Sequence, residues 1–335
     1  MKRQSLYFVA ARRVELRTED LPEPGAGEVR VKAVCSAIST GTELLLYKGE
    51  APAALAADAT LPALSRTLAY PLKYGYSMVG RVEAMGLDVE KSWQGRLVFA
   101  FNPHETAFNA RVNDLLPLPK NCAEQDAAFL PAMETAVNLI LDGEPRLGER
   151  VVVLGQGVIG LLATGLLARH PLDALIAFDR YPLRRELSLA LEAQASLDPA
   201  DSVAEAQQSL GARGADLVYE LSGNPEALNL AMELVGDQGR IVVGSWYGVR
   251  RAALSLGERF HRGRVKIISS QVSHIEPALR GRWDRQRRFE LAWKMLAEVQ
   301  PSRLVTRQLA FDKAAEAYAA LDREPEKNLA ILLSY

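Results

Sequence analysis

The chain has 335 residues, of which 48% are hydrophobic and 24% charged, and its formal net charge is −1. This composition is that of a globular protein with enough apolar material for two domains, and it gives no general drive toward nucleic acid or an anionic membrane. Two cysteines exclude a disulfide framework and a cysteine-rich zinc site. The N-terminus lacks the apolar run of a signal peptide, and no apolar run is long enough to span a bilayer. We therefore expect a cytoplasmic protein without a membrane partner.

The first part of the chain is predicted to form short strands. Residues 28–34 alternate polar and apolar side chains, which is typical of a half-buried strand, and residues 80–86 and 95–102 are further short predicted strands bounded by glycine. Residues 51–70 differ because they are rich in alanine and contain two prolines. This stretch suits either an insertion on the substrate side or a surface excursion without function.

From about residue 123 the pattern changes to alternating strands and helices. Helical spacing at 123–141 is followed by apolar strands that alternate with helices, and this rhythm predicts a parallel sheet flanked by helices. The predicted strands are 150–155, 174–179, 215–223, 239–245 and 265–271, and the helices between them are 158–170, 182–193 and 225–235. Helices at 288–299 and 311–321 and a strand at 328–335 complete the chain.

The most specific motif is VVVLGQGVIG, residues 151–160, in which a GxGxxG pattern follows an apolar strand and opens a helix. Gly155 permits the tight turn, Gly157 lets the backbone approach a pyrophosphate, and Gly160 lets the helix pack closely on the strand. The N-terminus of that helix favours anions. The alternative is a glycine-rich turn that binds no nucleotide. The predicted cofactor-binding residues of the turn are Gly155, Gln156, Gly157, Val158, Ile159 and Gly160.

The following strand ends at Asp179, about twenty residues beyond the glycines. A carboxylate at this point accepts hydrogen bonds from ribose hydroxyls and repels a 2′-phosphate, which favours NAD over NADP. Arg180, Arg184 and Arg185 leave NADP open, because an arginine beside the carboxylate can accommodate the phosphate.

Two later strands end in small polar residues. Ligands of parallel sheets bind beyond the carboxyl ends of the strands, so Ser222, Gly223, Gly244 and Ser245 are candidate cofactor contacts. The alternative for each is an ordinary turn residue.

The chain as a whole resembles the medium-chain dehydrogenase/reductase superfamily of alcohol-dehydrogenase-like enzymes. PGAGEVRVKAVCSAISTGTE (24–43) is similar to its early strand and catalytic loop, YGYSMVGRVEAMG (74–86) to its GHExxGxVxxxG block, and FDKAAEAYAAL (311–321) to its late helix. The resemblance implies an α/β protein with a Rossmann doubly wound parallel sheet domain at 123–272. It also implies a β-rich, GroES-like catalytic domain built from 1–122 and 273–335, and homodimers formed through the nucleotide domain.

Three further stretches resemble the subgroup typified by the hydroxyethyl-bacteriochlorophyllide dehydrogenases, which oxidise a secondary alcohol on a tetrapyrrole to a ketone. These stretches are SAISTGTELLLYKGEAP (36–52), FHRGRVKIISSQVSHI (260–275) and GRWDRQRRFELAW (281–293). Within the superfamily, Thr135 matches a position that contacts the nicotinamide, and Ser270 lies near the stretch that binds its carboxamide.

The chain departs from the superfamily at its zinc ligands. The Cys and His positions fall on Ser39 and Tyr76, the Cys-or-acid position falls near Pro131, and Ser77 replaces the glutamate beside the histidine. Zinc needs about three ligands of Cys, His or carboxylate type, so the resemblance implies a zinc-free member with no metal site. His104 and Glu105 are possible ligands, but a solvated loop pair is the expectation.

Without zinc, hydroxyl groups are the available donors to the oxygen on which charge develops during hydride transfer. Tyr76 occupies the vacated histidine position, Ser39, Thr40 and Thr42 lie on the facing loop, and Glu43 is placed to orient Tyr76. The alternative is that Tyr76 is an inert aromatic filling the zinc cavity.

The prediction is a zinc-independent NAD(P)-dependent oxidoreductase that acts on an alcohol/ketone pair in secondary or biosynthetic metabolism. A reductase of C=C or imine bonds and a non-catalytic nucleotide-binding protein are the alternatives. The basic stretches 261–266 and 280–288 suit either an anionic substrate group or, more often, a solvated face or interface.

Overall fold

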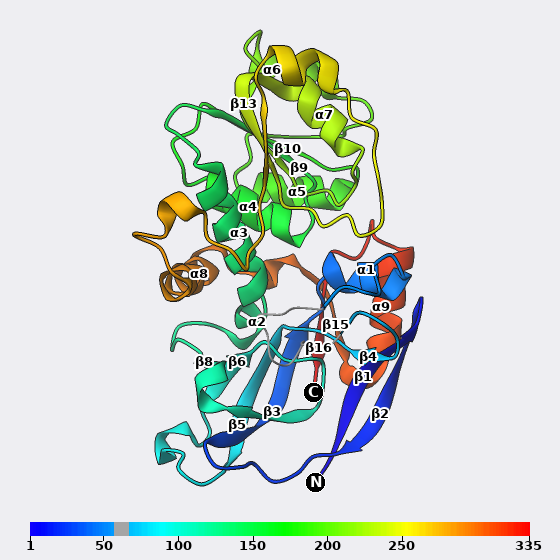
Figure 1. The fold of residues 1–335 in the computed structure, drawn as a ribbon, viewed down its shortest axis with the longest axis vertical. Coiled ribbons are helices and arrows are strands. Elements are labelled where there is room, and N and C mark those ends of the chain that lie inside the picture. The colour runs from blue at the N-terminus through cyan, green and yellow to red at the C-terminus, as the bar shows by residue number, and fades with distance from the viewer. Residues whose placement is uncertain (57–66) are drawn as a thin grey trace. The chain divides into compact units, whose positions relative to one another are not determined.

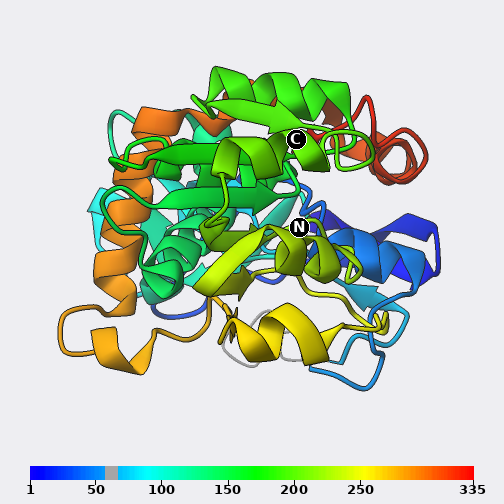
Figure 2. The ribbon, with the colours of Figure 1, turned by 90° about the horizontal axis from the view of Figure 1, so that it is seen from above.

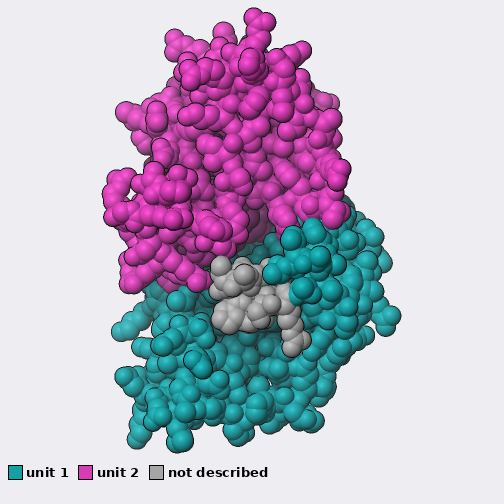
Figure 3. All heavy atoms as spheres, viewed as in Figure 1, with its two compact units in different colours: residues 1–131, 300–335 teal, residues 132–299 magenta. Residues whose placement is uncertain are grey.

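The computed structural model describes residues 1–56 and 67–335, so half of the alanine-rich stretch 51–70 lies outside the described residues. The chain forms two compact units, residues 1–131 with 300–335 and residues 132–299 (Figure 3). The expected domain boundaries at 122 and 272 therefore differ from those of the compact units. The second unit extends beyond 272 because it includes helix α8 (Arg285–Val299), which packs on α4 (Val158–Leu167).

A six-stranded sheet forms the centre of the second unit. Its order is β11-β10-β9-β12-β13-β14, and every neighbouring pair is parallel. This is the order of the doubly wound dinucleotide-binding fold, so the predicted parallel sheet is confirmed. The strands are β9 (Arg150–Leu154), β10 (Ala174–Phe178), β11 (Ala195–Leu197), β12 (Ala215–Glu220), β13 (Val235–Val243) and β14 (Lys266–Ser269).

Helices cover both faces of this sheet because alternate strand residues point to opposite sides (Figures 1 and 2). On one face, residues such as Val152 and Ile176 pack with α6 (Val203–Leu210) and α7 (Ala227–Leu234). On the other, Val151 and Val153 pack with Leu139 of α3 (Leu130–Gly143) and Leu167 of α4. Helix α5 (Pro182–Ala190) follows β10.

The first unit is mostly antiparallel. Its larger sheet has the order β15-β16-β3-β5-β6-β8, with β7 paired to β3, and a smaller sheet has the order β2-β1-β4. The larger sheet contains β3 (Glu28–Ala37), β5 (Met78–Met85), β6 (Leu97–Ala100), β7 (Ala107–Arg111), β8 (Leu115–Pro117), β15 (Val305–Ala310) and β16 (Ala330–Ser334). The smaller contains β1 (Lys2–Ala10), β2 (Arg13–Asp20) and β4 (Leu72–Lys73).

Among the described residues, these sheets are accompanied by the α-helices α1 (Thr42–Lys48), α2 (Glu124–Ala127) and α9 (Ala314–Arg323). The buried face of α9 packs with β1 and α1, because Tyr318 contacts the rings of Phe8 and Tyr47. In the part of the chain that the structure describes, no helix is long and apolar enough to cross a membrane.

Candidate functional site

The glycine-rich turn after β9 has the geometry that close approach of a phosphate requires. Gly155 has a φ of +92°, and a Cβ there would lie 2.4 Å from Ser222 Cα. A Cβ on Gly160 would lie 1.9 Å from the Gly155 carbonyl oxygen. Around Gly157, by contrast, no atom beyond the adjacent residues of the chain lies within 4 Å of the position a Cβ would take. The first and third glycines are therefore required for packing, whereas the second faces open space.

Gln156 and Asp179 close the base of this turn. The Asp179 carboxylate accepts hydrogen bonds from the backbone N–H groups of Gln156 (2.8 Å) and Tyr181 (2.9 Å). The Gln156 side chain is fully buried and accepts a hydrogen bond from Thr164 Oγ1 at 3.0 Å. Gln156 thus braces the turn from inside. Val158 is buried and Ile159 half-buried at the first positions of α4.

The arginines beside Asp179 surround an aromatic ring. The guanidinium carbons of Arg180 and Arg184 lie 4.6 and 4.7 Å from the centroid of the Tyr181 ring. Arg184 Nη1 is 3.8 Å from Asp179 Oδ2, and Arg185 donates to the backbone carbonyl of Asp179 at 2.8 Å. The acid therefore lies among cations at the end of β10.

A buried carboxylate that sequence reasoning missed organises the ends of β12 and β13. Glu220 is fully buried and accepts hydrogen bonds from Ser222 N (2.8 Å) and from the Tyr247 hydroxyl. Burial raises the pKa of Tyr247, as does its contact with Glu220, so Tyr247 remains a donor. Ser245 Oγ accepts from Gly223 N at 2.9 Å. The sequence signal that could have identified Glu220 is an acidic residue in the last position of a mostly apolar strand.

The predicted contacts at this end of the sheet differ in their surroundings. The position of a Cβ on Gly244 is taken by side-chain atoms of Leu139 and Leu221, each 2.6 Å away. Gly244 is therefore a close-packing position, with only its backbone available to a ligand. Thr135 is half-buried on α3, and Ser270 follows β14 with its hydroxyl donating to Asp142 Oδ2 at 2.6 Å.

In the first unit the structure brings together three of the four candidate catalytic residues. The Tyr76 hydroxyl donates to Ser39 Oγ at 2.6 Å, and the backbone N–H of Ser39 donates to Glu43 Oε1 at 2.9 Å. Glu43 lies in the first turn of α1 and is fully buried. Thr42 begins that helix and is half-buried, as is Thr40. The result is a pair of hydrogen-bonded hydroxyls from two segments, of which the Ser39 segment is held through its backbone by the Glu43 carboxylate.

His104 is not the solvated loop residue that we expected. It is fully buried, with Nε2 3.0 Å from Glu43 Oε2 and Nδ1 2.7 Å from Ser36 Oγ. A Cβ on Gly75, where φ is +119°, would lie 2.6 Å from the imidazole ring. The glycine before Tyr76 is therefore required to make room for His104.

Two tyrosines complete the surroundings of Glu43 and His104. The Tyr318 hydroxyl donates to Glu43 Oε2, and the Tyr335 and Ser36 hydroxyls are hydrogen-bonded at 2.9 Å. Burial raises the pKa of both tyrosines well above its usual value, and Glu43 raises that of Tyr318 further. Tyr318 remains a protonated donor, so the Glu43 carboxylate has three partners, which are the Ser39 N–H, the His104 ring and the Tyr318 hydroxyl.

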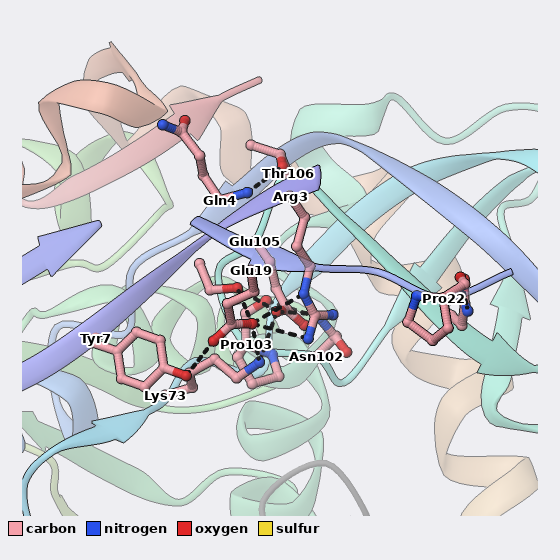
Figure 4. A network of polar contacts seen from close by, with 12 residues as sticks. Arg3, Gln4, Tyr7, Glu19, Pro22, Lys73, Asn102, Pro103, Glu105 and Thr106 are labelled. Carbon is pink, nitrogen blue, oxygen red and sulfur yellow. Dashed lines mark hydrogen bonds and ion pairs between the residues drawn. The ribbon is translucent and has the colours of Figure 1, made fainter. Parts of the chain in front are cut away.

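Glu105 is also buried rather than solvated, and it belongs to a separate ion network (Figure 4). Its carboxylate accepts from Asn102 Nδ2 at 3.0 Å and lies 3.1 Å from Lys73 Nζ and 3.2 Å from Arg3 Nη1. Glu19 joins through the same two cations. These contacts account for Glu105 as a structural residue linking β1, β2 and β4.

The residues at the family's zinc positions do not fit a zinc ion. Tyr76 and Ser39 present hydroxyls that bond to each other, and Ser77 Oγ donates to the Ala128 carbonyl. Both ring nitrogens of His104 have partners. Among the residues that the structure describes, no group of three or more His, Cys, Asp or Glu side chains is arranged to hold a metal ion.

Comparison with known proteins supports the same architecture. Residues 158–292 match the model of a family described as zinc-binding dehydrogenase. D-Guloside 3-dehydrogenase of Escherichia coli K12 is 27% identical over 263 residues, covering 76% of this chain and 75% of that protein. L-Threonine 3-dehydrogenase of Stenotrophomonas maltophilia is 25% identical over 265 residues, covering 70% and 74%.

Solved structures are similar over the full length. A structure described as a short-chain alcohol dehydrogenase of E. coli CFT073 in complex with NADH has a TM-score of 0.80 and 19% identity, and the match covers 100% of this chain and 99% of that one. The 2R,3R-butanediol dehydrogenase of Bacillus subtilis has the same TM-score and identity, with 99% of each chain covered. The partial family match and the curated relatives support an oxidoreductase that is similar to the zinc-type, alcohol-dehydrogenase-like medium-chain dehydrogenases/reductases, and the solved structures share its fold.

Proposed function

We propose that this chain is a zinc-independent dehydrogenase that binds a nicotinamide dinucleotide and interconverts an alcohol and a ketone. The observation that carries the proposal is the turn at Gly155–Gly160, where the packing leaves open space at Gly157 alone of the three glycines. Asp179 follows at the end of the neighbouring strand, where a ribose carboxylate is required.

NAD is the favoured form of the cofactor. The residues that would hold its adenosine half are Asp179 and the turn backbone, since the carboxylate would repel a 2′-phosphate. Arg180 and Arg184 give NADP some support, because both lie against Tyr181 near that carboxylate. When bound, the nicotinamide supplies or accepts a hydride.

The chain's own residues then handle the proton. Tyr76 Oη and Ser39 Oγ form a hydrogen-bonded pair in which either oxygen can donate to a substrate oxygen that gains charge. Glu43 fixes the backbone of Ser39, and His104 and Tyr318 fix Glu43. This arrangement supports a role for Tyr76 as a preorganised donor, because its partner is held by buried groups rather than by solvent.

The substrate class proposed is a secondary alcohol. The names of two relatives specify oxidation at carbon 3 of a guloside and of threonine, both of which are secondary carbinols. The resemblance to the bacteriochlorophyllide dehydrogenase subgroup points to the same functional group on a larger molecule. A panel of secondary alcohols and ketones that differ in size is therefore the first assay, and product analysis separates ketone reduction from C=C or imine reduction.

Cofactor binding tests the proposal directly. Titration with NADH and NADPH, followed by the fluorescence of the reduced nicotinamide, should give saturable binding with NADH preferred. Binding of neither at millimolar concentration refutes it. Elemental analysis of active protein tests zinc independence, which stoichiometric zinc would contradict.

The role of Tyr76 has its own test. Tyr76→Phe should lower turnover about a hundredfold or more, the contribution of a positioned proton donor, while NADH affinity is kept. Tyr7→Phe removes a hydroxyl from the same unit, where it bonds to Glu19, and should leave turnover unchanged. Unchanged turnover in Tyr76→Phe would mean that the ring only fills space.

A further inference from the structure

One member of the basic stretch 280–288 is not solvated. Arg288 in α8 is only 3% exposed, whereas its neighbours Arg285 and Arg287 are exposed. Its Nε and Nη2 lie 3.1 and 2.7 Å from Glu134 Oε1, and its Nη1 donates to Asn138 Oδ1 at 2.6 Å. The guanidinium thus bonds two residues on successive turns of α3.

These bonds continue from α3 to the end of β14. Asn138 Nδ2 donates to Asp142 Oδ2 at 2.9 Å and to Ser270 Oγ at 3.3 Å. Ser270 Oγ in turn donates to Asp142 Oδ2 at 2.6 Å. A continuous polar chain therefore connects a buried cation on α8 to the residue that follows the last strand of the parallel sheet.

The far end of this chain lies at a defined part of the nucleotide site. Doubly wound sheets consist of two mononucleotide-binding halves, and ligands bind at the carboxyl ends of the strands. Asp179 follows β10 and marks the adenosine half. Ser270 follows β14 in the other half of the sheet, beyond β12 and β13. Given the proposed function, on which this step rests, the nicotinamide half of the dinucleotide lies over Ser270.

We propose that Arg288 is a positioning residue for the nicotinamide half of the cofactor. It orients the Asn138 amide, so that Asn138 and Asp142 hold the Ser270 hydroxyl and the backbone that carries it. Arginine is suited to this task because its planar fork bonds two acceptors at once, which lysine's single ammonium group does not reproduce. Without the guanidinium, Glu134 becomes a buried carboxylate without its ion-pair partner, and the face of α3 that holds Ser270 must rearrange.

Two ligands separate this role from a purely structural one. NADH carries both halves of the dinucleotide, whereas ADP-ribose lacks the nicotinamide. Calorimetric titration of Arg288→Met with each should show NADH affinity reduced about fivefold or more, the lower end of couplings between linked sites, with ADP-ribose affinity unchanged. Arg288→Lys, which keeps the charge, should show a smaller loss of the same kind. Arg287→Met removes an exposed charge from the same helix and should alter neither affinity.

Each outcome of these titrations either supports or overturns the proposed role of Arg288. Equal loss of affinity for NADH and ADP-ribose in both Arg288 variants, or loss of all binding, assigns Arg288 to the stability of the whole unit and overturns the proposal. Unchanged NADH affinity also overturns it. Failure of the proposed function is recognised separately, because the unaltered protein would then bind neither NADH nor NADPH at millimolar concentration.

Discussion

Substitution of Gly157 by alanine separates cofactor binding from stability. Gly157 has φ −69° and ψ −175°, which alanine adopts without strain, and no atom beyond the adjacent residues of the chain lies within 4 Å of the added Cβ. The neighbouring Gly160 offers the contrast, because the same methyl group would lie 1.9 Å from the Gly155 carbonyl oxygen and 2.9 Å from its carbon. The two variants should therefore fail in different ways.

The expected changes in stability and in NADH affinity follow from the surroundings of Gly157. Alanine at a compatible backbone position stabilises by about 0.4–1 kcal/mol through the unfolded chain. Gly157 is also the N-cap of α4, where alanine costs roughly 0.5–1 kcal/mol relative to glycine, so the net change is close to zero. A methyl group in the path of the pyrophosphate should cost about 1–3 kcal/mol of binding, as overpacking does elsewhere, which is about 5- to 150-fold in affinity.

Fluorescence titration with NADH and thermal unfolding measure the two effects. Gly157→Ala should bind NADH at least about fivefold more weakly with its Tm unchanged within about 3 °C. Gly160→Ala should lower the Tm by roughly 2–12 °C, since overpacking against backbone costs about 1–3 kcal/mol or more. Gly257→Ala is the control, because Gly257 also has open space but shares a surface hollow with Asp237, at the amino end of β13. Full NADH affinity in Gly157→Ala would refute the reasoning.

Two further predictions concern a buried histidine and a partly exposed glutamate in the first unit. His104→Leu should lower the free energy of unfolding by about 1–3 kcal/mol, because Glu43 loses a buried partner, and urea denaturation should show no such loss for the exposed His274→Leu. Burial by itself raises the pKa of Glu19, but hydrogen bonds, the strongest from Tyr7, outweigh it and lower the pKa from 4.5 to about 2. Because the native pKa is depressed, Glu19 stabilises the fold above about pH 4.5, and this contribution is lost as the pH falls toward 2. Glu19→Gln should therefore flatten the dependence of Tm on pH in that window, and a slope equal to that of the unaltered protein would contradict the network in Figure 4.

Local sequence patterns were sufficient to predict the parallel sheet and the glycine-rich turn after β9. Both depend on local patterns. Apolar strands that alternate with helices predict a parallel sheet covered by helices, and the turn needs glycine at fixed offsets. The open position at Gly157 and the crowded ones at Gly155 and Gly160 agree with the roles that spacing alone assigned.

Which charged residues are buried depends on contacts between segments that are distant in the sequence. His104 meets Glu43 61 residues away, and Arg288 meets Glu134 154 residues away, so neither partner is visible in the local sequence. Glu220 is likewise buried at a strand end where Tyr247 and Ser222 satisfy it. A charged side chain in a polar stretch is usually solvated, and it becomes a buried positioning group only where distant segments supply its hydrogen bonds, because burial without them is too costly.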